Sequence, residues 1–154
     1  MISTPQTISR RSALISASAA ACAMMLAPRL AMADAAMVTD ELKKLFGDKK
    51  LSDGKIKVDL PQIAENGLVV PITVEVDSPM TDADYVKAVH IFAEGNPLPG
   101  VATFKFTPAC GKAMASTRMR LSQTQNVICV AEMSNGSLHT SKTEVKVTIG
   151  GCGG

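Results

Sequence analysis

The sequence has 154 residues, with 16 basic and 14 acidic side chains and a formal net charge of +2. This length suits a single domain. The charge is nearly balanced, only 3% of residues are aromatic, and no basic patch is interleaved with aromatic residues, which argues against a nucleic-acid-binding protein.

Residues 1–33 have the pattern of an export signal. Arg10 and Arg11 precede the run SALISASAAACAMMLA, which is too short and too rich in Ala and Ser for a good membrane span. Ala31 and Ala33 form an A-x-A cleavage pattern at its end. We predict a twin-arginine signal that is cleaved on transport to the periplasm, with no membrane attachment afterwards; a general secretory signal is the alternative. The leader holds three of the 16 basic residues and no acidic ones, so 13 basic residues then stand against 14 acidic, a charge near −1.

Residues 38–47, VTDELKKLFG, have the pattern of one short helix. Thr39 can cap its start, and the acidic residues that follow suit the positive first turn of a helix. Gly47 can end it. We expect one apolar face to pack on the core, formed by Val38, Leu42, Leu45 and Phe46.

From residue 55 onward the apolar period changes to two, as in half-buried strands. DYVKAVHIFAE and NVICVAEM are apolar on both faces, as central strands are. Regular turn sequences separate about seven expected strands. For residues 34–149 we therefore predict a mainly β fold, an immunoglobulin-like antiparallel β-sandwich with a short N-terminal helix. The positions expected to point inward are Ile56, Val58, Leu60, Val70, Ile72, Val74, Val76, Phe104, Phe106, Val145, Val147 and Ile149.

Side chains suited to catalysis are scattered along the chain. His90 and His139 have no ligand-like spacing to a second His or to a Cys, and no nucleophile-elbow, phosphate-loop or metalloprotease motif occurs. We expect His90 to be a structural residue of its strand and His139 to be solvated. The sequence predicts no catalytic residue, no metal site and no cofactor, so the chain is not expected to be an enzyme.

The sulfur-containing side chains leave one alternative open, a periplasmic metal-binding chaperone that uses Cys and Met. Soft sulfur ligands select Cu(I), but the methionines form no M-x-x-M cluster and are better explained as core fillers. Cys129 shares a strand face with apolar residues and is expected to be buried. Cys110 lies in a turn and is expected to be partly exposed. A disulfide between these two cysteines stays open at this point.

The C-terminal sequence GGCGG, residues 150–154, places one thiol between two pairs of glycines. A thiolate is a strong nucleophile, and glycine neither obstructs a narrow channel nor restricts the backbone. The last strand would mount the thiol up to about 10 Å beyond Ile149. This pattern suits a flexible, substrate-carrying swinging arm, while a frayed tail with a dimerising disulfide or a purely structural module remain alternatives. The arm would consist of Gly150, Gly151, Cys152, Gly153 and Gly154.

The chain after the leader resembles the SoxY family, the sulfur-carrier subunits of the periplasmic SoxYZ complex of thiosulfate oxidation. The resemblance lies in ENGLVVPITVEVDSPMTDADYVKAVHIFAEGNPLPGVATFKFTP, in STRMRLSQTQNVICVAEMSNGS and in the closing GGCGG. It implies that Cys152 is the substrate-attachment residue and that the four glycines form its arm. Cys110 and Cys129 are not part of the family pattern, so they put in doubt that Cys152 is the only reactive thiol.

The resemblance also implies partners and a reaction cycle. A SoxZ-like subunit, a related β-sandwich without the cysteine arm, would form the heterodimer. A c-type cytochrome sulfur transferase would join thiosulfate to Cys152, a sulfate-releasing hydrolase would remove the terminal sulfonate, and a sulfane dehydrogenase would oxidise the remaining sulfur. No cofactor is implied apart from the covalently bound sulfur species.

Overall fold

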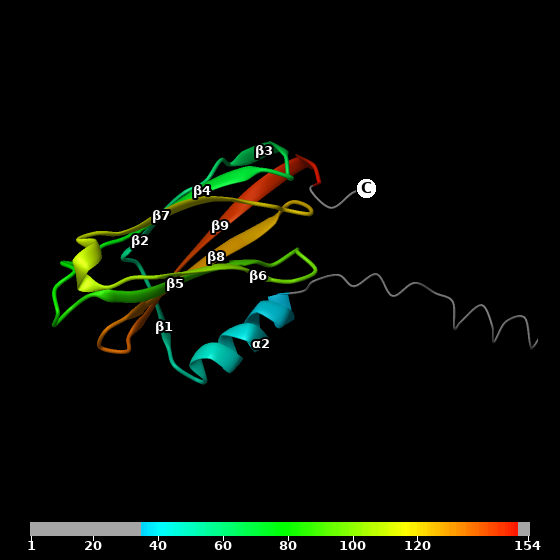
Figure 1. Ribbon diagram of the computed structural model, residues 1–154. Helices are drawn as coiled ribbons and strands as arrows, with labels where there is room; N and C mark the ends of the chain where they lie inside the picture. The colour runs from blue at the N-terminus through cyan, green and yellow to red at the C-terminus, as the bar shows by residue number, and fades with distance from the viewer. Residues whose placement is uncertain (1–34, 151–154) are drawn as a thin grey trace, which may run out of the picture. The chain divides into compact units, whose positions relative to one another are not determined.

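The computed structural model describes residues 35–150, which belong to one compact unit. Two β-sheets stack on each other, and a helix lies outside the larger sheet (Figure 1). The predicted mainly β sandwich with a short N-terminal helix is confirmed. The elements are α2 (Ala35–Phe46), β1 (Leu51–Asp53), β2 (Ile56–Asp59), β3 (Ile63–Asn66), β4 (Val70–Val76), β5 (Val86–Ala93), β6 (Gly100–Lys105), the short 3₁₀ turn η1 (Pro108–Cys110), β7 (Ala113–Met119), β8 (Gln125–Met133) and β9 (Leu138–Ile149).

The larger sheet has the strand order β1-β9-β8-β5-β6, with β3 also paired to β9, and the smaller sheet has the order β2-β4-β7. β5 and β8 are central strands, as predicted. The pairing is antiparallel except that β1 and β3 both run parallel to β9, with Leu51 opposite Leu138 and Ala64 opposite Val147. The C-terminal strand is therefore flanked on both sides.

The main core lies between the two sheets. Because alternate side chains of a strand point to the same face, the inward side chains of β4 reach Ile91 of β5 and Cys129 of β8 in one apolar cluster. All four inward positions predicted for β4 are at most 2% exposed: Val70, Ile72, Val74 and Val76.

The helix α2 begins at Ala35, so the predicted start near Val38 was wrong. Thr39 lies inside the helix rather than at its cap, and the first turn holds no acidic residue. The predicted end is correct: Gly47 has φ +66° and its N–H donates to the Lys43 carbonyl at 2.8 Å, a left-handed helix end that glycine adopts readily.

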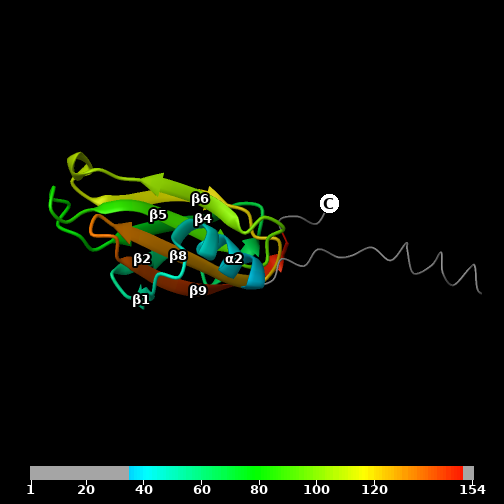
Figure 2. The same ribbon diagram turned by 90° about the horizontal axis from the view of Figure 1, so that it is seen from below.

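One face of α2 packs on the outer side of the larger sheet (Figure 2), where Val38 joins Phe92 and Val130 in a second apolar cluster. Leu42 and Phe46 also pack there. Leu45, predicted on this face, is 51% exposed, because it lies beside the contact line and over a groove between α2 and β6.

The predicted number of strands, about seven, was too low, because residues 35–150 contain nine. β1 and β3 are too short to show a period. β7 has small or polar residues such as Ser116, and only its ends are fully buried.

Ile149, predicted to point inward, is 69% exposed, because exposure rises along β9 from buried Val145 to half-buried Val147 as the strand leaves the core.

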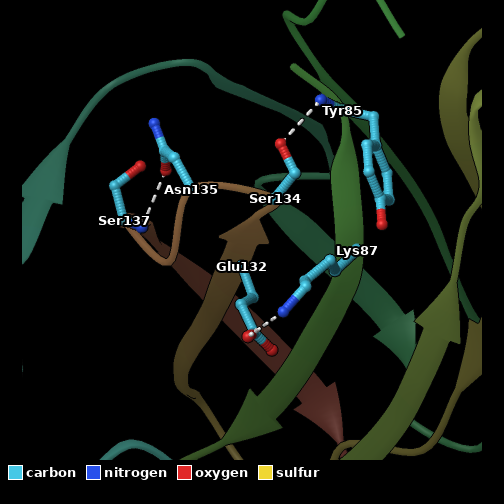
Figure 3. A network of polar contacts seen from close by, with 6 residues as sticks. All are labelled: Tyr85, Lys87, Glu132, Ser134, Asn135 and Ser137. Atoms are coloured by element: carbon cyan, nitrogen blue, oxygen red, sulfur yellow. Dashed lines mark hydrogen bonds and ion pairs between the residues drawn. The ribbon is translucent and has the colours of Figure 1, made fainter. Parts of the chain in front are cut away.

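One hydrogen bond within the turn between β8 and β9 and one from the residue before β5 hold this turn in place (Figure 3). Asn135 Oδ1 accepts from the Ser137 N–H at 2.9 Å, and Ser134 Oγ accepts from the Tyr85 N–H at 3.1 Å. This turn precedes β9, so it lies at the opposite end of that strand from Gly150. None of the helices in the described part of the chain is long and apolar enough to cross a membrane.

Candidate functional site at the root of the C-terminal arm

The predicted attachment residue, Cys152, lies outside the described residues, together with Gly151, Gly153 and Gly154. Gly150 and the strand that leads to it are described. The geometry available is therefore that of the arm root, defined as Ile149 and Gly150 with the residues that contact them.

The last residues of β9 are held from both sides. The Ile149 carbonyl accepts a hydrogen bond from the Gly67 N–H at 2.8 Å, and Thr148 Oγ1 donates to the Glu65 carbonyl at 2.8 Å. On the other side, the Val147 N–H donates to Thr124 Oγ1 at 2.9 Å. The strand is thus fixed up to its last residue.

Gly150 packs against the backbone of Ser122. A Cβ atom on Gly150 would collide with the Ser122 carbonyl oxygen and would lie 3.3 Å from its carbonyl carbon. Real Cβ atoms do not approach backbone atoms this closely, so an L side chain at position 150 requires a shift of the root or of Ser122. Glycine is needed here for space.

Ser122 belongs to a segment, residues 120–125, that a polar network attaches to the β5–β6 loop. Asn96 Oδ1 accepts from the Ser122 N–H and from Gln125 Nε2, both at 3.0 Å, and Asn96 Nδ2 donates to the Arg120 carbonyl at 2.8 Å. Ser122 Oγ donates to the Gly95 carbonyl at 2.6 Å. Gln125 is only 6% exposed, and its hydrogen bonds satisfy a buried amide that would otherwise destabilise the fold.

Apolar side chains are exposed around the arm root. Ile149 is 69% exposed, and Leu68 and Val69 are 45% and 57% exposed. They lie close together because Gly67, which precedes Leu68, donates its N–H to the Ile149 carbonyl. Contiguous exposed apolar surface often marks an interaction site.

The two described cysteines are unpaired and differ sharply in environment. Cys129 is fully buried, as predicted, and burial raises the pKa of its thiol to about 12. Cys110 is exposed in η1, as predicted, and hydrogen bonds from the backbone and side chain of Thr107 lower the pKa of its thiol. The disulfide that the sequence left open does not form.

His90 has a structural environment, as predicted. Its Nδ1 lies 3.0 Å from Thr103 Oγ1, and its ring contacts Phe46 edge-on at 5.1 Å between centroids. Burial lowers the pKa of His90. His139, predicted to be solvated, is only partly exposed and its Nδ1 is buried, because it sits within β9 opposite Ser52 of β1.

A metal ion could bind to the described residues only where suitable side chains are grouped together. Within residues 35–150, no three His, Cys, Asp or Glu side chains are grouped so that they could hold one. Three methionines fill the core, while two are exposed, so the core-filler interpretation holds for only part of the set. The buried ones are Met80, Met119 and Met133, and the exposed ones are Met37 and Met114.

Sequence reasoning did not find the network around Asn96. It joins two loops that are 24 or more residues apart, and single-sequence patterns report on neighbours along the chain. The only sequence signal is the polar run SQTQ at residues 122–125, which by itself predicts no more than a break between strands.

Solved structures share this architecture. A variant of the superoxide reductase (neelaredoxin) from Ignicoccus hospitalis is 16% identical with a TM-score of 0.55, covering 70% of this chain and 90% of that chain. At this identity the likeness shows the β-sandwich fold alone. The sulfur carrier protein SoxY from Chlorobium limicola f. thiosulfatophilum is 34% identical with a TM-score of 0.64, covering 75% of this chain and 100% of that chain.

The family model described as sulfur oxidation protein SoxY matches residues 42–152, a span that ends on the C-terminal cysteine. The chain therefore belongs to the SoxY family of sulfur oxidation proteins, which confirms the resemblance seen in the sequence. No curated protein sequence matches this chain significantly.

Proposed function

We propose that the chain is a covalent carrier of sulfur intermediates, with Cys152 as the attachment residue and partner enzymes as the catalysts. The observation that carries this proposal is the family match, which reaches Cys152. A relative with 34% identity is itself named a sulfur carrier protein. The fixed end of β9 supports the proposal, because it provides a rigid mount that ends three residues before Cys152.

The proposed loading step joins the Cys152 thiolate to the sulfane sulfur of thiosulfate. A new S–S bond forms, and the two electrons released pass to a c-type cytochrome enzyme. A hydrolase then adds water to the terminal sulfonate, which releases sulfate and two protons and leaves a persulfide anion on Cys152. A sulfane dehydrogenase then oxidises the outer sulfur to a sulfonate, with three water molecules as the oxygen source and six electrons passed to a cytochrome acceptor. A second hydrolysis breaks the S–S bond, which releases sulfate and returns the Cys152 thiol to the cycle. The carrier itself needs no cofactor for these steps.

Cys152 suits this role better than the two described thiols. Cys129 is buried with a pKa of about 12, so it has almost no thiolate near neutral pH. Cys110 is accessible, but it sits in the 3₁₀ turn η1, at the opposite end of the sandwich from the end of β9 (Figure 1). Only Cys152 combines a thiol with flanking glycines that could enter a channel.

The proposed partners follow from the same family. A SoxZ-like subunit would complete a heterodimer, and the exposed Leu68, Val69 and Ile149 offer apolar contact area near the arm. We place the complex in the periplasm, on the basis of the twin-arginine pattern in residues 1–33, which lie outside the described part. No group of His, Cys, Asp or Glu among the described residues could hold a metal ion, and a metal-binding chaperone that uses Cys and Met stays the alternative.

The test is intact-mass spectrometry of the carrier after turnover on thiosulfate with its partner enzymes. We expect sulfur-containing adducts that peptide mapping assigns to Cys152. Cys152→Ser should abolish both adducts and sulfate release, whereas Cys110→Ser, the matched control, should retain them. Full sulfate release by Cys152→Ser would refute the proposal.

A further inference from the structure

We propose that Gly150 is part of the rigid body rather than of the moving arm, and that Asn96 is a positioning residue which sets the direction of the arm through Ser122. This inference rests on the proposed role of Cys152 as the carrier thiol. It assigns different tasks to glycines that look equivalent in the sequence.

The first step is the fixation of the root. The carbonyl of Ile149 is bonded to the Gly67 N–H, and the Gly67 carbonyl in turn accepts from the Leu121 N–H, both at 2.8 Å. One residue further, Gly150 is half-buried against the Ser122 carbonyl, with no room for a Cβ. The root is therefore enclosed between Gly67 and Ser122, which leaves Gly150 little freedom to rotate.

The second step is the fixation of Ser122 itself. The four side-chain hydrogen bonds of Asn96 reach Ser122, Gln125 and Arg120, so one side chain ties down both ends of this segment. The two loops are also tightly packed, because a Cβ on Gly95 would lie 3.0 Å from Gln123 Nε2 and 3.1 Å from Gln125 Cβ. Asn96 thus holds the surface against which Gly150 rests, without a hydrogen bond to Gly150.

The fixation of Gly150 limits how far the Cys152 thiol can extend from the sandwich. With Gly150 fixed, Cys152 is two residues along the chain from the fixed point. Two extended residues span at most about 7 Å. A partner enzyme must then bring its active-site entrance directly onto the arm root, and the exit direction set at Gly150 decides which docking orientations deliver the thiol.

The first experiment measures backbone ¹⁵N order parameters of the full chain. We expect Gly150 to have a value near 0.85, like a rigid strand, and Gly153 to fall below about 0.6. Asn96→Ala should lower the value at Gly150, and Asn96→Asp, which keeps the acceptor for Ser122, should lower it less. Asn135→Ala is the matched control, since it removes a turn-stabilising amide at the other end of β9 and should leave Gly150 unchanged.

The second experiment separates positioning from chemistry. Gly150→Ala should leave the reaction of Cys152 with a small maleimide unchanged, but should lower kcat/KM of the sulfate-releasing hydrolase for the loaded carrier by about ten- to a hundredfold, because a displacement of about 1 Å can have such an effect. Asn96→Ala should lower kcat/KM in the same direction, mainly through a raised KM, and Asn96→Asp should recover part of it.

Two results would overturn the inference: an order parameter at Gly150 as low as that at Gly153, or wild-type kcat/KM for Gly150→Ala. Neither result would contradict the proposed function, which fails only if Cys152→Ser still supports sulfate release. If Asn96→Ala does not fold, the wild-type order parameters and the Gly150→Ala kinetics still decide the placement of Gly150, and Asn96→Asp decides the role of Asn96.

Discussion

The thiol of Cys129 should stay inert in the folded protein while the thiol of Cys110 reacts. The perturbation is N-ethylmaleimide at pH 8, applied to a chain that carries Cys22→Ser and Cys152→Ser so that only these two cysteines remain. With a pKa of about 12 for Cys129, about one thiol in ten thousand is ionised at pH 8, whereas an exposed thiol of pKa about 8.5 is about one-quarter ionised.

The thiolate ratio alone predicts a rate difference of more than about a thousandfold. Burial adds to it, because Cys129 is 0% exposed and the reagent needs an opening of the core to reach it. The assay is intact mass against time, with peptide mapping to assign each adduct, and the same reaction in concentrated urea as the reference in which both thiols react. Modification of Cys129 within tenfold of the rate at Cys110 in native protein would refute the assignment of Cys129 to a closed core.

Three further predictions concern stability. Ile72→Ala should lower the free energy of unfolding by about 2–5 kcal/mol in urea titrations, because Ile72 is 1% exposed between the sheets; a loss below about 1 kcal/mol would contradict that packing. Burial lowers the pKa of His90 in the folded state, so its contribution to stability is full above the unfolded pKa of about 6.5 and is lost as the pH falls from there through the lowered folded-state pKa; His90→Phe should therefore flatten the dependence of the urea midpoint on pH between pH 7.5 and 5.5, and an unchanged slope would count against it. Burial acts to raise the pKa of Glu94, but hydrogen bonds from Lys142 and Asn126 outweigh it and leave the pKa lowered, so Glu94→Gln should destabilise the fold above about pH 4.3 and cease to matter in stronger acid, as thermal melts at pH 7 and pH 3 would show.

The elements with a strong local period were predictable from the sequence. β4 alternates over four large aliphatic residues that the two-sheet core requires, and β5 and β8 are apolar on both faces because one side meets the other sheet and the other side carries α2. β7 was missed because Ser116 and its neighbours are small or polar. The start of α2 was misplaced because Thr39 is a good cap by residue type, yet the helix continues upstream to Ala35.

The chemistry proposed for the candidate site rests on a local sequence motif, whereas the geometry of the arm root could not be predicted from any such motif. The motif GGCGG predicts Cys152 as the attachment thiol with glycines on both sides, and this assignment stays a prediction. The contact between Gly150 and Ser122 joins positions 28 residues apart in the chain, and the Asn96 amide reaches across a similar separation. Such contacts depend on how loops meet after the sheets have paired, which no local pattern records.

The place of β9 in the sheet affects the order in which a nascent chain can be completed. β9, the last strand of the described residues, is an interior one, since β8 lies on one side and β1 and β3 on the other. β1 and β3, made early, have no partner in the larger sheet until residues 138–149 have been synthesised. A chain that terminates prematurely lacks an interior strand as well as the thiol, so it should be cleared by proteolysis as unfolded material. The topology thereby makes folding depend on synthesis of the chain through residue 149, and copies that stop earlier should not accumulate as folded protein.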